Sequence, residues 1–302
     1  MKQIIFLISA PRSGSTLLQK LLVTSSHINT AAEPWWLLPL LLYRSSEGDE
    51  SYNKRIASKA IQDFDAYFNR KTGGSLDIEI SKMVSEVYAS LAPEKGYFLD
   101  KTPRYYLILD ELRHLFPSAK FILLTRNPLE ILASKLHGHS GTFHAYYKYK
   151  IDLYQGVNTI TKSIQRRDNN VFNLDYNELV TSESKSVKTL QSFLNLDDID
   201  SNKINQVEVE GKMGDPAAMI QNEGIRLEKS LWHTAVDSPI KYLVFKKLFS
   251  SISDDYFHFS GTSKSSIEKE FKKISWSAYF NLWQGIIDSL TLLRSYLTKN
   301  RK

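Results

Sequence analysis

The chain has 302 residues, with 39 Lys and Arg against 33 Asp and Glu, no Cys, and a hydrophobic fraction of 42%. This apolar content is enough for a folded core and excludes an intrinsically disordered chain. The lack of cysteine excludes disulfide frameworks, thiolate zinc sites, iron–sulfur clusters and cysteine nucleophiles. It also fits a reducing compartment, and we expect a cytoplasmic protein.

The net charge of +6 is unevenly distributed. Residues 264–302 hold eight basic and three acidic side chains, so this tail carries +5 and the rest of the chain only +1. A nucleic-acid-binding protein usually spreads positive charge over its folded body. The distribution therefore argues against a nucleic-acid partner and predicts that any anion site in the body is local.

Two apolar runs could be mistaken for membrane signals. Residues 4–10 are at the lower limit for the apolar core of a signal peptide, and they are followed by a turn sequence. Residues 35–43 are too few to span a bilayer, and Pro39 interrupts them. We therefore expect no transmembrane segment.

Apolar runs that read as buried strands alternate with segments of helical spacing. This alternation predicts an α/β fold around a central, mostly parallel sheet with right-handed crossovers. The expected strands are residues 4–9, 97–100, 121–125 and 171–174, and the expected helices are residues 15–24, 110–116, 128–136 and 176–194.

The chain is predicted to form one domain over residues 1–262, with a helical insertion at residues 54–91. Residues 202–224 read as a long polar loop and residues 260–266 as a linker. A basic, amphipathic helical segment follows at residues 263–302, and its apolar positions are Trp276, Phe280, Trp283, Ile287, Leu290, Leu293 and Leu297. We expect this apolar face to pack on the protein's own core or on a homodimer partner. Peripheral membrane contact is the alternative.

The segment between the first expected strand and helix is typical of a phosphate-binding loop. Gly14 allows a tight turn, and the backbone N–H groups at the start of the helix attract an anion. Arg12 adds charge, and Ser13, Ser15 and Thr16 add hydroxyl donors. A simple strand–helix turn capped by Ser is the alternative. The segment is not a Walker A loop, because that motif requires a Lys after the second glycine.

Residues 10–22 resemble the 5′-phosphosulfate loop of sulfotransferases that use 3′-phosphoadenosine 5′-phosphosulfate (PAPS). Residues 121–134 resemble the 3′-phosphate site of the same family, where a strand ends in Arg and a Ser follows eight positions later. Arg126 and Ser134 keep that spacing. An Arg at the edge of the sheet and a Ser on the next helix can both reach one phosphate.

Three further positions match the family in order. Glu33, 21 residues after Arg12, stands where the tyrosylprotein and related bacterial branches place a catalytic Glu. Lys101 resembles the lysine that contacts the sulfuryl group and the bridging oxygen, and Tyr176 resembles a residue near the adenine nucleotide. Lys212 is a looser match to a late 3′-phosphate ligand.

The resemblance is closer to the branch with an Arg-Ser-Gly loop than to the cytosolic small-molecule branch. In the latter branch a Lys stands at the position of Arg12 and a Trp at that of Leu17. The resemblance implies a P-loop-like, three-layer α/β/α fold. Its implied activity is in-line transfer of a sulfuryl group from PAPS to an acceptor hydroxyl or amine, with adenosine 3′,5′-bisphosphate (PAP) as product.

The resemblance also implies the roles of the catalytic residues. Glu33 would be the base, and Lys101 and Arg12 would stabilise negative charge, with no metal required. The acceptor stays open among small molecules, carbohydrates, lipids and peptides. A P-loop kinase or NTPase and a non-catalytic nucleotide-binding protein are the alternative functions.

Two other groups of residues are ambiguous. His137, His139 and His144 lie within eight residues and could line the mouth of the active site, lie exposed or bind a metal, and His137 is an alternative base. The aromatic residues Trp35, Trp36 and Tyr43 could form an acceptor pocket or belong to a core helix.

Overall fold

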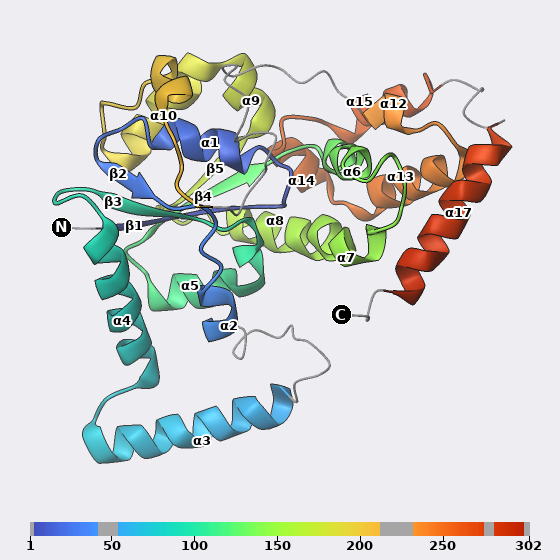
Figure 1. Ribbon diagram of the computed structural model, residues 1–302. Coiled ribbons are helices and arrows are strands. Elements are labelled where there is room, and N and C mark those ends of the chain that lie inside the picture. Colours follow the sequence, from blue (N-terminus) through green and yellow to red (C-terminus); the bar gives the residue numbers. More distant parts are fainter. Residues whose placement is uncertain (1–2, 42–53, 212–231, 275–280, 299–302) are drawn as a thin grey trace.

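The computed structural model describes residues 3–41, 54–211, 232–274 and 281–298 (Figure 1). Its centre is a five-stranded sheet in the order β2-β3-β1-β4-β5, and every neighbouring pair is parallel. The strands are β1 (Gln3–Ser9), β2 (Ile28–Thr30), β3 (Tyr97–Lys101), β4 (Lys120–Thr125) and β5 (Val171–Asp175). The four predicted strands are confirmed. The sequence analysis missed β2, because three residues with one apolar side chain give no readable pattern.

Helices cover both faces of the sheet, which confirms the three-layer α/β/α prediction. Phe6 and Ile8 of β1 face one core cluster, and Ile5 and Leu7 face the other. Side chains of successive strand residues point to opposite faces, so an unbroken apolar run fits a strand covered on both sides. The first layer includes α2 (Leu37–Leu41), α4 (Leu76–Leu91), α5 (Leu109–Leu115) and α6 (Pro128–His137). The second includes α1 (Ser15–Leu22), α9 (Tyr176–Thr181) and α10 (Glu183–Leu194).

The remaining elements lie mainly around the first layer. They are α3 (Lys54–Thr72), η1 (Pro103–Ile108), α7 (Tyr146–Ile151), the π-helix η2 (Asp152–Gly156), α8 (Val157–Gln165), η3 (Ser201–Gln206), α12 (Trp232–Ala235), α13 (Pro239–Ser251), α14 (Asp254–Phe259), α15 (Lys264–Phe271) and α17 (Leu282–Leu297). Among the described residues, no helix combines the length and apolar character that a bilayer crossing requires.

Residues 54–91 form two helices, α3 and α4. Helix α4 packs against β1, β3 and α5, with Val84 and Tyr88 buried. Helix α3 extends away from the sheet at the edge of the molecule (Figure 1). The status of this segment as an insertion remains a prediction.

The prediction of a linker at residues 260–266 is wrong. Ser260 is fully buried, and Gly261 has a left-handed backbone with φ of +70°. Ser263 then caps α15 by accepting a hydrogen bond from the N–H of Ser266. Residues 260–263 form a tight turn and a helix cap between two packed helices. Gly and Ser are common both in such turns and in linkers, so their presence alone does not distinguish the two.

Candidate active site

The loop between β1 and α1 has the backbone of an anion-binding turn. Arg12 and Gly14 both lie in the left-handed region, with φ of +78° and +93°. The N–H of Ser13 donates to the carbonyl of Ala10 over 3.2 Å, and α1 begins at Ser15. Turns of this kind direct successive N–H groups toward a common point, and the start of the helix adds its positive dipole end.

The hydroxyl groups of this loop fit a phosphate-bearing ligand. The Oγ atoms of Ser9 and Ser13 are buried and have no hydrogen-bond partner among the residues described. Ser15 and Thr16 are also buried, at the first turn of α1. A buried hydroxyl without a partner costs free energy, so an orphaned hydroxyl calls for an explanation such as an unseen ligand. Phosphate oxygens would accept from these hydroxyls and from the loop N–H groups.

Arg126, at the carboxyl end of β4, lies against this loop. Its Nη1 donates to the carbonyl of Arg12 over 3.2 Å, and its guanidinium carbon lies 4.2 Å from the ring centre of Tyr176. The Tyr176 ring also covers Gly14 so closely that a Cβ there would lie 2.5 Å from two ring carbons. Glu130, one turn further along α6, accepts from Arg126 Nε over 3.1 Å.

Ser134 completes this group. Its Oγ lies 3.2 Å from Nε of Arg12, which donates to it across 122 residues of chain. The structure thus brings together Arg12, Gly14, Arg126, Ser134 and Tyr176, which the sequence placed in three separate segments. Lys212 lies outside the described residues.

The predicted catalytic residues Glu33 and Lys101 form an ion pair. Lys101 Nζ lies 2.9 Å from Glu33 Oε1, and its side chain is fully buried while that of Glu33 is 13% exposed. The other oxygen, Oε2, accepts from the indole Nε1 of Trp35 over 2.9 Å. Lys101 ends β3 in register with Leu7 of the adjacent β1, so the pair lies at the sheet edge from which the loop of Arg12 emerges.

A buried hydrogen-bond network holds the segment that follows Glu33 in place. Asp100 is fully buried and accepts from the hydroxyls of Thr102, over 2.8 Å, and of Tyr88. Thr102 Oγ1 accepts from the N–H of Trp35 over 3.4 Å, and the Tyr88 hydroxyl accepts from the indole of Trp36 over 2.8 Å. Burial raises the pKa of Asp100 to about 6, against the lowering effect of these hydrogen bonds.

Trp35 occupies a strained position. Its φ is +60°, which is unfavourable for a residue with a Cβ. Such strain persists only where surrounding contacts enforce it and is common at functional sites. Trp35 and Trp36, predicted to line an acceptor pocket or to belong to a core helix, precede α2 and hydrogen-bond to Glu33 and Tyr88. Tyr43 lies outside the described residues.

Sequence reasoning missed a second charged group beside the site. Asp152 is fully buried and accepts from Arg104 Nε over 2.8 Å, from Lys135 Nζ over 3.0 Å and from the Tyr106 hydroxyl over 2.6 Å. Burial lowers the pKa of Lys135. Burial by itself would raise the pKa of Asp152, but the hydrogen bonds and the positive charges around it outweigh that effect and lower the pKa. Lys135 follows Ser134 directly, and Arg104 lies 5.8 Å from the Trp35 ring centre, so the group adjoins both halves of the site.

The three histidines do not form a metal site with other ligands. In the part of the chain that the structure describes, no three His, Asp or Glu side chains come close enough together to hold a metal ion. The His139 ring instead stacks on Tyr149, at 6.1 Å between ring centres.

Comparison with known families shows which family the chain belongs to. The profile described as the sulfotransferase family matches residues 4–200, which is more than half of the chain. The chain belongs to the sulfotransferase family. Members of this family are enzymes that take their sulfuryl group from PAPS. Membership of the sulfotransferase family argues against the alternative of a P-loop kinase or NTPase.

The similarity to an individual relative covers a smaller part of the chain than the family match does. Nodulation protein NoeE of Sinorhizobium fredii (strain NBRC 101917 / NGR234) is 35% identical over 134 residues, which make up 43% of this chain and 30% of NoeE. The chain therefore matches less than a third of that relative's length.

Several solved sulfotransferases resemble the structure. The sulfotransferase domain from the curacin biosynthetic pathway is 20% identical, with a TM-score of 0.46 and coverage of 96% of this chain and 97% of that one. Mouse sulfotransferase SULT7A1, solved with PAP, is 16% identical, with a TM-score of 0.48 and coverage of 86% and 88%. The sulfotransferase of Alicyclobacillus acidocaldarius is 11% identical, with a TM-score of 0.47 and coverage of 89% and 99%.

Proposed function

We propose that this sulfotransferase binds PAPS across the β1–α1 loop and the β4–α6 segment, and sulfates a hydroxyl of a small acceptor with Glu33 as the base. The observation that carries the proposal is the 2.9 Å contact between Lys101 Nζ and Glu33 Oε1 at the carboxyl edge of the sheet. It joins a proton acceptor and a fixed cation at one point, beside a loop whose buried Ser13 hydroxyl fits a phosphate.

The nucleotide-binding residues would divide the two phosphates between them. The N–H groups and hydroxyls of Ser13, Ser15 and Thr16 would hold the 5′-phosphate at the start of α1. Arg126 and Ser134 would hold the 3′-phosphate, because a guanidinium and a hydroxyl on adjacent elements suit one phosphate. Tyr176 packs on both Gly14 and Arg126 and would fix the position of the nucleotide.

PAPS, when bound, supplies the sulfuryl group, whose transfer forms an O–S bond to the acceptor and breaks the O–S bond to the 5′-phosphate. Glu33 would take the proton of the acceptor hydroxyl onto its carboxylate. Trp35 would orient that carboxylate through Oε2, to which its indole already donates. Lys101 and Arg12 would place positive charge where negative charge develops, a role that a preorganised cation performs best in a buried site.

Thermal unfolding with PAP, ADP and ATP, each with and without Mg²⁺, tests the nucleotide site. A ligand at a concentration of about 100 times its Kd stabilises the folded state by about 2.7 kcal/mol. We expect PAP to raise the Tm by several degrees without Mg²⁺. Stabilisation by Mg-ATP alone would refute the PAPS site.

A screen with radiolabelled PAPS and hydroxyl acceptors, including para-nitrophenol and alkyl glucosides, tests the transfer. The expected product is a labelled sulfate ester. PAP binding without transfer to any acceptor would instead favour a non-catalytic nucleotide-binding protein.

A further inference from the structure

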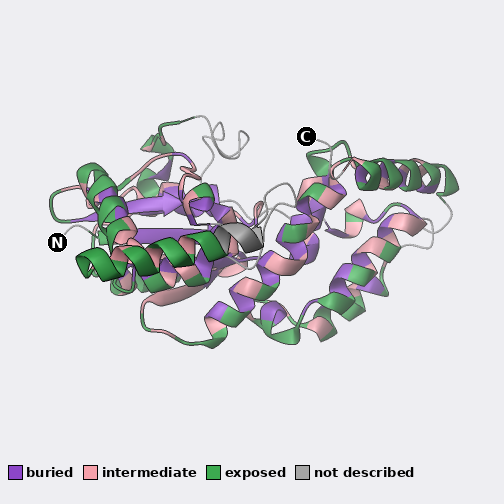
Figure 2. Ribbon diagram, turned by 90° about the horizontal axis from the view of Figure 1, so that it is seen from below, coloured by how far each residue is buried: buried purple, intermediate pink, exposed green. Residues whose placement is uncertain are grey.

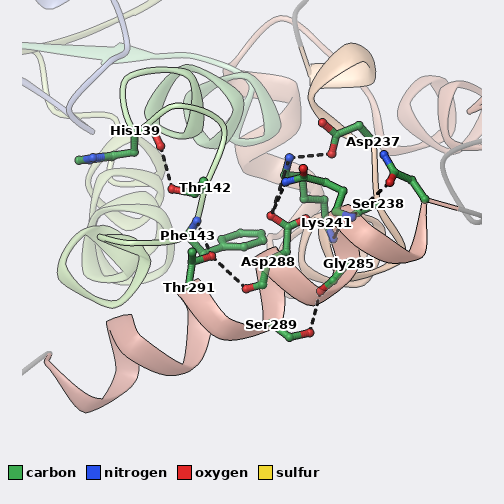
Figure 3. Close-up of polar contacts among 12 residues, drawn as sticks. His139, Thr142, Phe143, Asp237, Ser238, Lys241, Gly285, Asp288, Ser289 and Thr291 are labelled. Carbon is green, nitrogen blue, oxygen red and sulfur yellow. Dashed lines mark hydrogen bonds and ion pairs between the residues drawn. The ribbon is translucent and has the colours of Figure 1, made fainter.

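Helix α17 is attached to the body of the protein by its polar face (Figure 3). The residues that it buries are Gly285, Asp288, Thr291 and Ser295. Asp288 is fully buried and accepts from Ser238 Oγ over 2.5 Å. The expectation that the apolar face packs on the protein's own core is therefore wrong for Trp283, Leu290, Leu293 and Leu297, which are exposed, whereas Ile287 is half-buried. Trp276 and Phe280 lie outside the described residues, and a homodimer partner stays a prediction.

Further hydrogen bonds fix the helix along its length. Thr291 Oγ1 accepts from the N–H of Phe143 over 3.3 Å, and Ser295 Oγ accepts from the N–H of Tyr147 over 3.0 Å. Lys241 of α13 lies 3.9 Å from Asp288 and adds an opposite charge at the same contact. These contacts involve both α13 and the segment from Phe143 to α7, so the orientation of α17 is well determined.

The outward face of α17 is consequently apolar. Its exposed large hydrophobic side chains are Leu282, Trp283, Ile286, Leu290, Leu293, Tyr296 and Leu297, with exposed fractions from 47% to 74%. In Figure 2 this helix, next to the C-terminal label, is largely green along its outer surface. A continuous apolar stripe of this kind on a folded surface usually marks a contact with a membrane or another protein.

The charges around the stripe indicate an anionic lipid surface as the occupant. The only acidic residue of α17, Asp288, is buried, whereas Arg294 is exposed. In the sequence, Lys299, Arg301 and Lys302 follow directly after the helix. The exposed charge of α17 is therefore positive, and the sequence that follows adds three more basic residues, which an anionic headgroup layer would complement.

The aromatic residues support the same occupant. Trp283 lies near one end of the stripe and Tyr296 near the other, and both residue types favour the boundary between headgroups and acyl chains. A second copy of the chain is the competing occupant, because positions 283, 286, 290, 293 and 297 follow the alternating three- and four-residue steps of a coiled coil. The positive charge and the aromatic residues favour the lipid surface, and the oligomeric state measured below tests the second copy.

We propose that α17 docks the enzyme on an anionic lipid bilayer, with its apolar stripe in the headgroup boundary and its polar face held by the protein. The helix lies on the side of the molecule to which the strands point (Figure 1), the side that also carries the candidate active site. Helix α17 packs against α7, and α7 packs against η2, so docking would bring the membrane next to the helices that adjoin the candidate active site.

Flotation of the full chain with vesicles tests this proposal. We would compare vesicles of equimolar phosphatidylcholine and phosphatidylglycerol with vesicles of phosphatidylcholine alone. The double variant Leu290→Glu/Leu293→Glu should lower binding to the anionic vesicles by about tenfold or more, because two apolar side chains no longer enter the boundary. Ile78→Glu on α4 is the matched control, since Ile78 and Leu290 are both 62% exposed.

Binding to the anionic vesicles that the double variant loses and Ile78→Glu retains would support the proposal. Equal thermal stability of the variants would show that the loss does not come from unfolding. Absence of vesicle binding, or equal loss in both variants, would overturn it. Light scattering coupled to gel filtration gives the other test: a dimer that the double variant dissociates, without vesicle binding, would assign the stripe to a second copy instead.

Discussion

Lys101 Nζ and Glu33 Oε1 lie 2.9 Å apart, although 68 residues of chain separate the two side chains. Lys101 is fully buried at the end of β3, and Glu33 lies on the segment that follows the edge strand β2. A buried ammonium is costly unless it is paired, so Glu33 stabilises Lys101 as much as Lys101 orients Glu33.

The variant Glu33→Gln should have a kcat about 10²–10⁴-fold lower, because an amide cannot take up the proton of the substrate hydroxyl. PAP affinity should stay close to that of the wild type, since the proposed nucleotide contacts are made by other residues. Radiolabelled transfer and PAP calorimetry measure the two effects. Glu86→Gln, an exposed change on α4, is the control. Wild-type turnover in Glu33→Gln would exclude Glu33 as the base.

Arg126→Ala should remove the preference for a 3′-phosphorylated nucleotide. The loss of a charge-assisted hydrogen bond costs about 1.5–3 kcal/mol, so PAP affinity should fall by about 10- to 150-fold. Affinity for adenosine 5′-phosphate should change much less. Calorimetric Kd values for both nucleotides give the ratio. Arg166→Ala removes an exposed pair with Asp110 and should leave the ratio unchanged. An unchanged ratio in Arg126→Ala would contradict the assignment.

Gly14→Ala should weaken PAP binding and lower stability by more than an Ala at a left-handed position normally costs. The added Cβ would lie 2.5 Å from the Tyr176 ring, whereas at Gly73, also left-handed with φ of +72°, it would meet no atom within 4 Å. We expect Gly73→Ala to cost about 1–2 kcal/mol of stability with normal PAP binding. Gly14→Ala should lose more stability and bind PAP weakly. Equal behaviour in urea unfolding and PAP titration would show that the Tyr176 contact is unimportant.

Tyr88→Phe should lower kcat by displacing the Glu33 segment, because it removes the hydroxyl that joins Asp100 to Trp36. Tyr97→Phe is a matched control that removes a buried hydroxyl bonded to the Leu194 carbonyl, away from the site. Both variants should lose about 1–3 kcal/mol of stability through an unpaired buried group. Only Tyr88→Phe should lose turnover at saturating PAPS. Equal losses of turnover in the two variants would show that the network stabilises the fold but does not position Glu33.

Asp198→Asn should destabilise the protein near neutral pH but not in acid. Burial opposes ionisation of Asp198, but hydrogen bonds from Ser25, Ser26 and His27 outweigh it and lower its pKa to about 2. An unfolded Asp has a pKa of about 3.9, so the folded state gains stability above that pH and loses it as the pH falls toward 2. The difference in urea midpoint between wild type and variant should therefore shrink from about pH 4 downward and disappear below about pH 2.

The neighbouring variant Asp197→Asn serves as the control for that titration. Asp197 is exposed, and its replacement should leave the pH profile of the wild type unchanged. A constant difference between Asp198→Asn and wild type from neutral pH down to about pH 2 would show that the carboxylate hydrogen bonds are not what stabilises this turn.

Local patterns in the sequence were sufficient for the strands at the core of the fold, and the resemblance to a family added the residues that we propose to bind the nucleotide. An apolar run that ends at a Gly-containing turn specifies a buried strand and a loop, whatever the rest of the chain does. The same holds for Arg126 and Ser134, which lie eight residues apart on one strand–helix unit. The structure confirms the strands and brings Arg126 and Ser134 to the same loop, where both contact Arg12, while their role in binding the nucleotide stays a prediction.

Contacts between distant segments were decided only by the tertiary structure. No pattern along the chain indicated that Asp152 would contact both Arg104 and Lys135, because that contact depends on how η1, α6 and η2 pack together. Helix α17 shows the same limit. Its periodicity established two faces, but an amphipathic pattern does not state which face the protein covers. Hydrogen bonds to Asp288, Thr291 and Ser295 turned the polar face inward, and only the folded body supplies their partners.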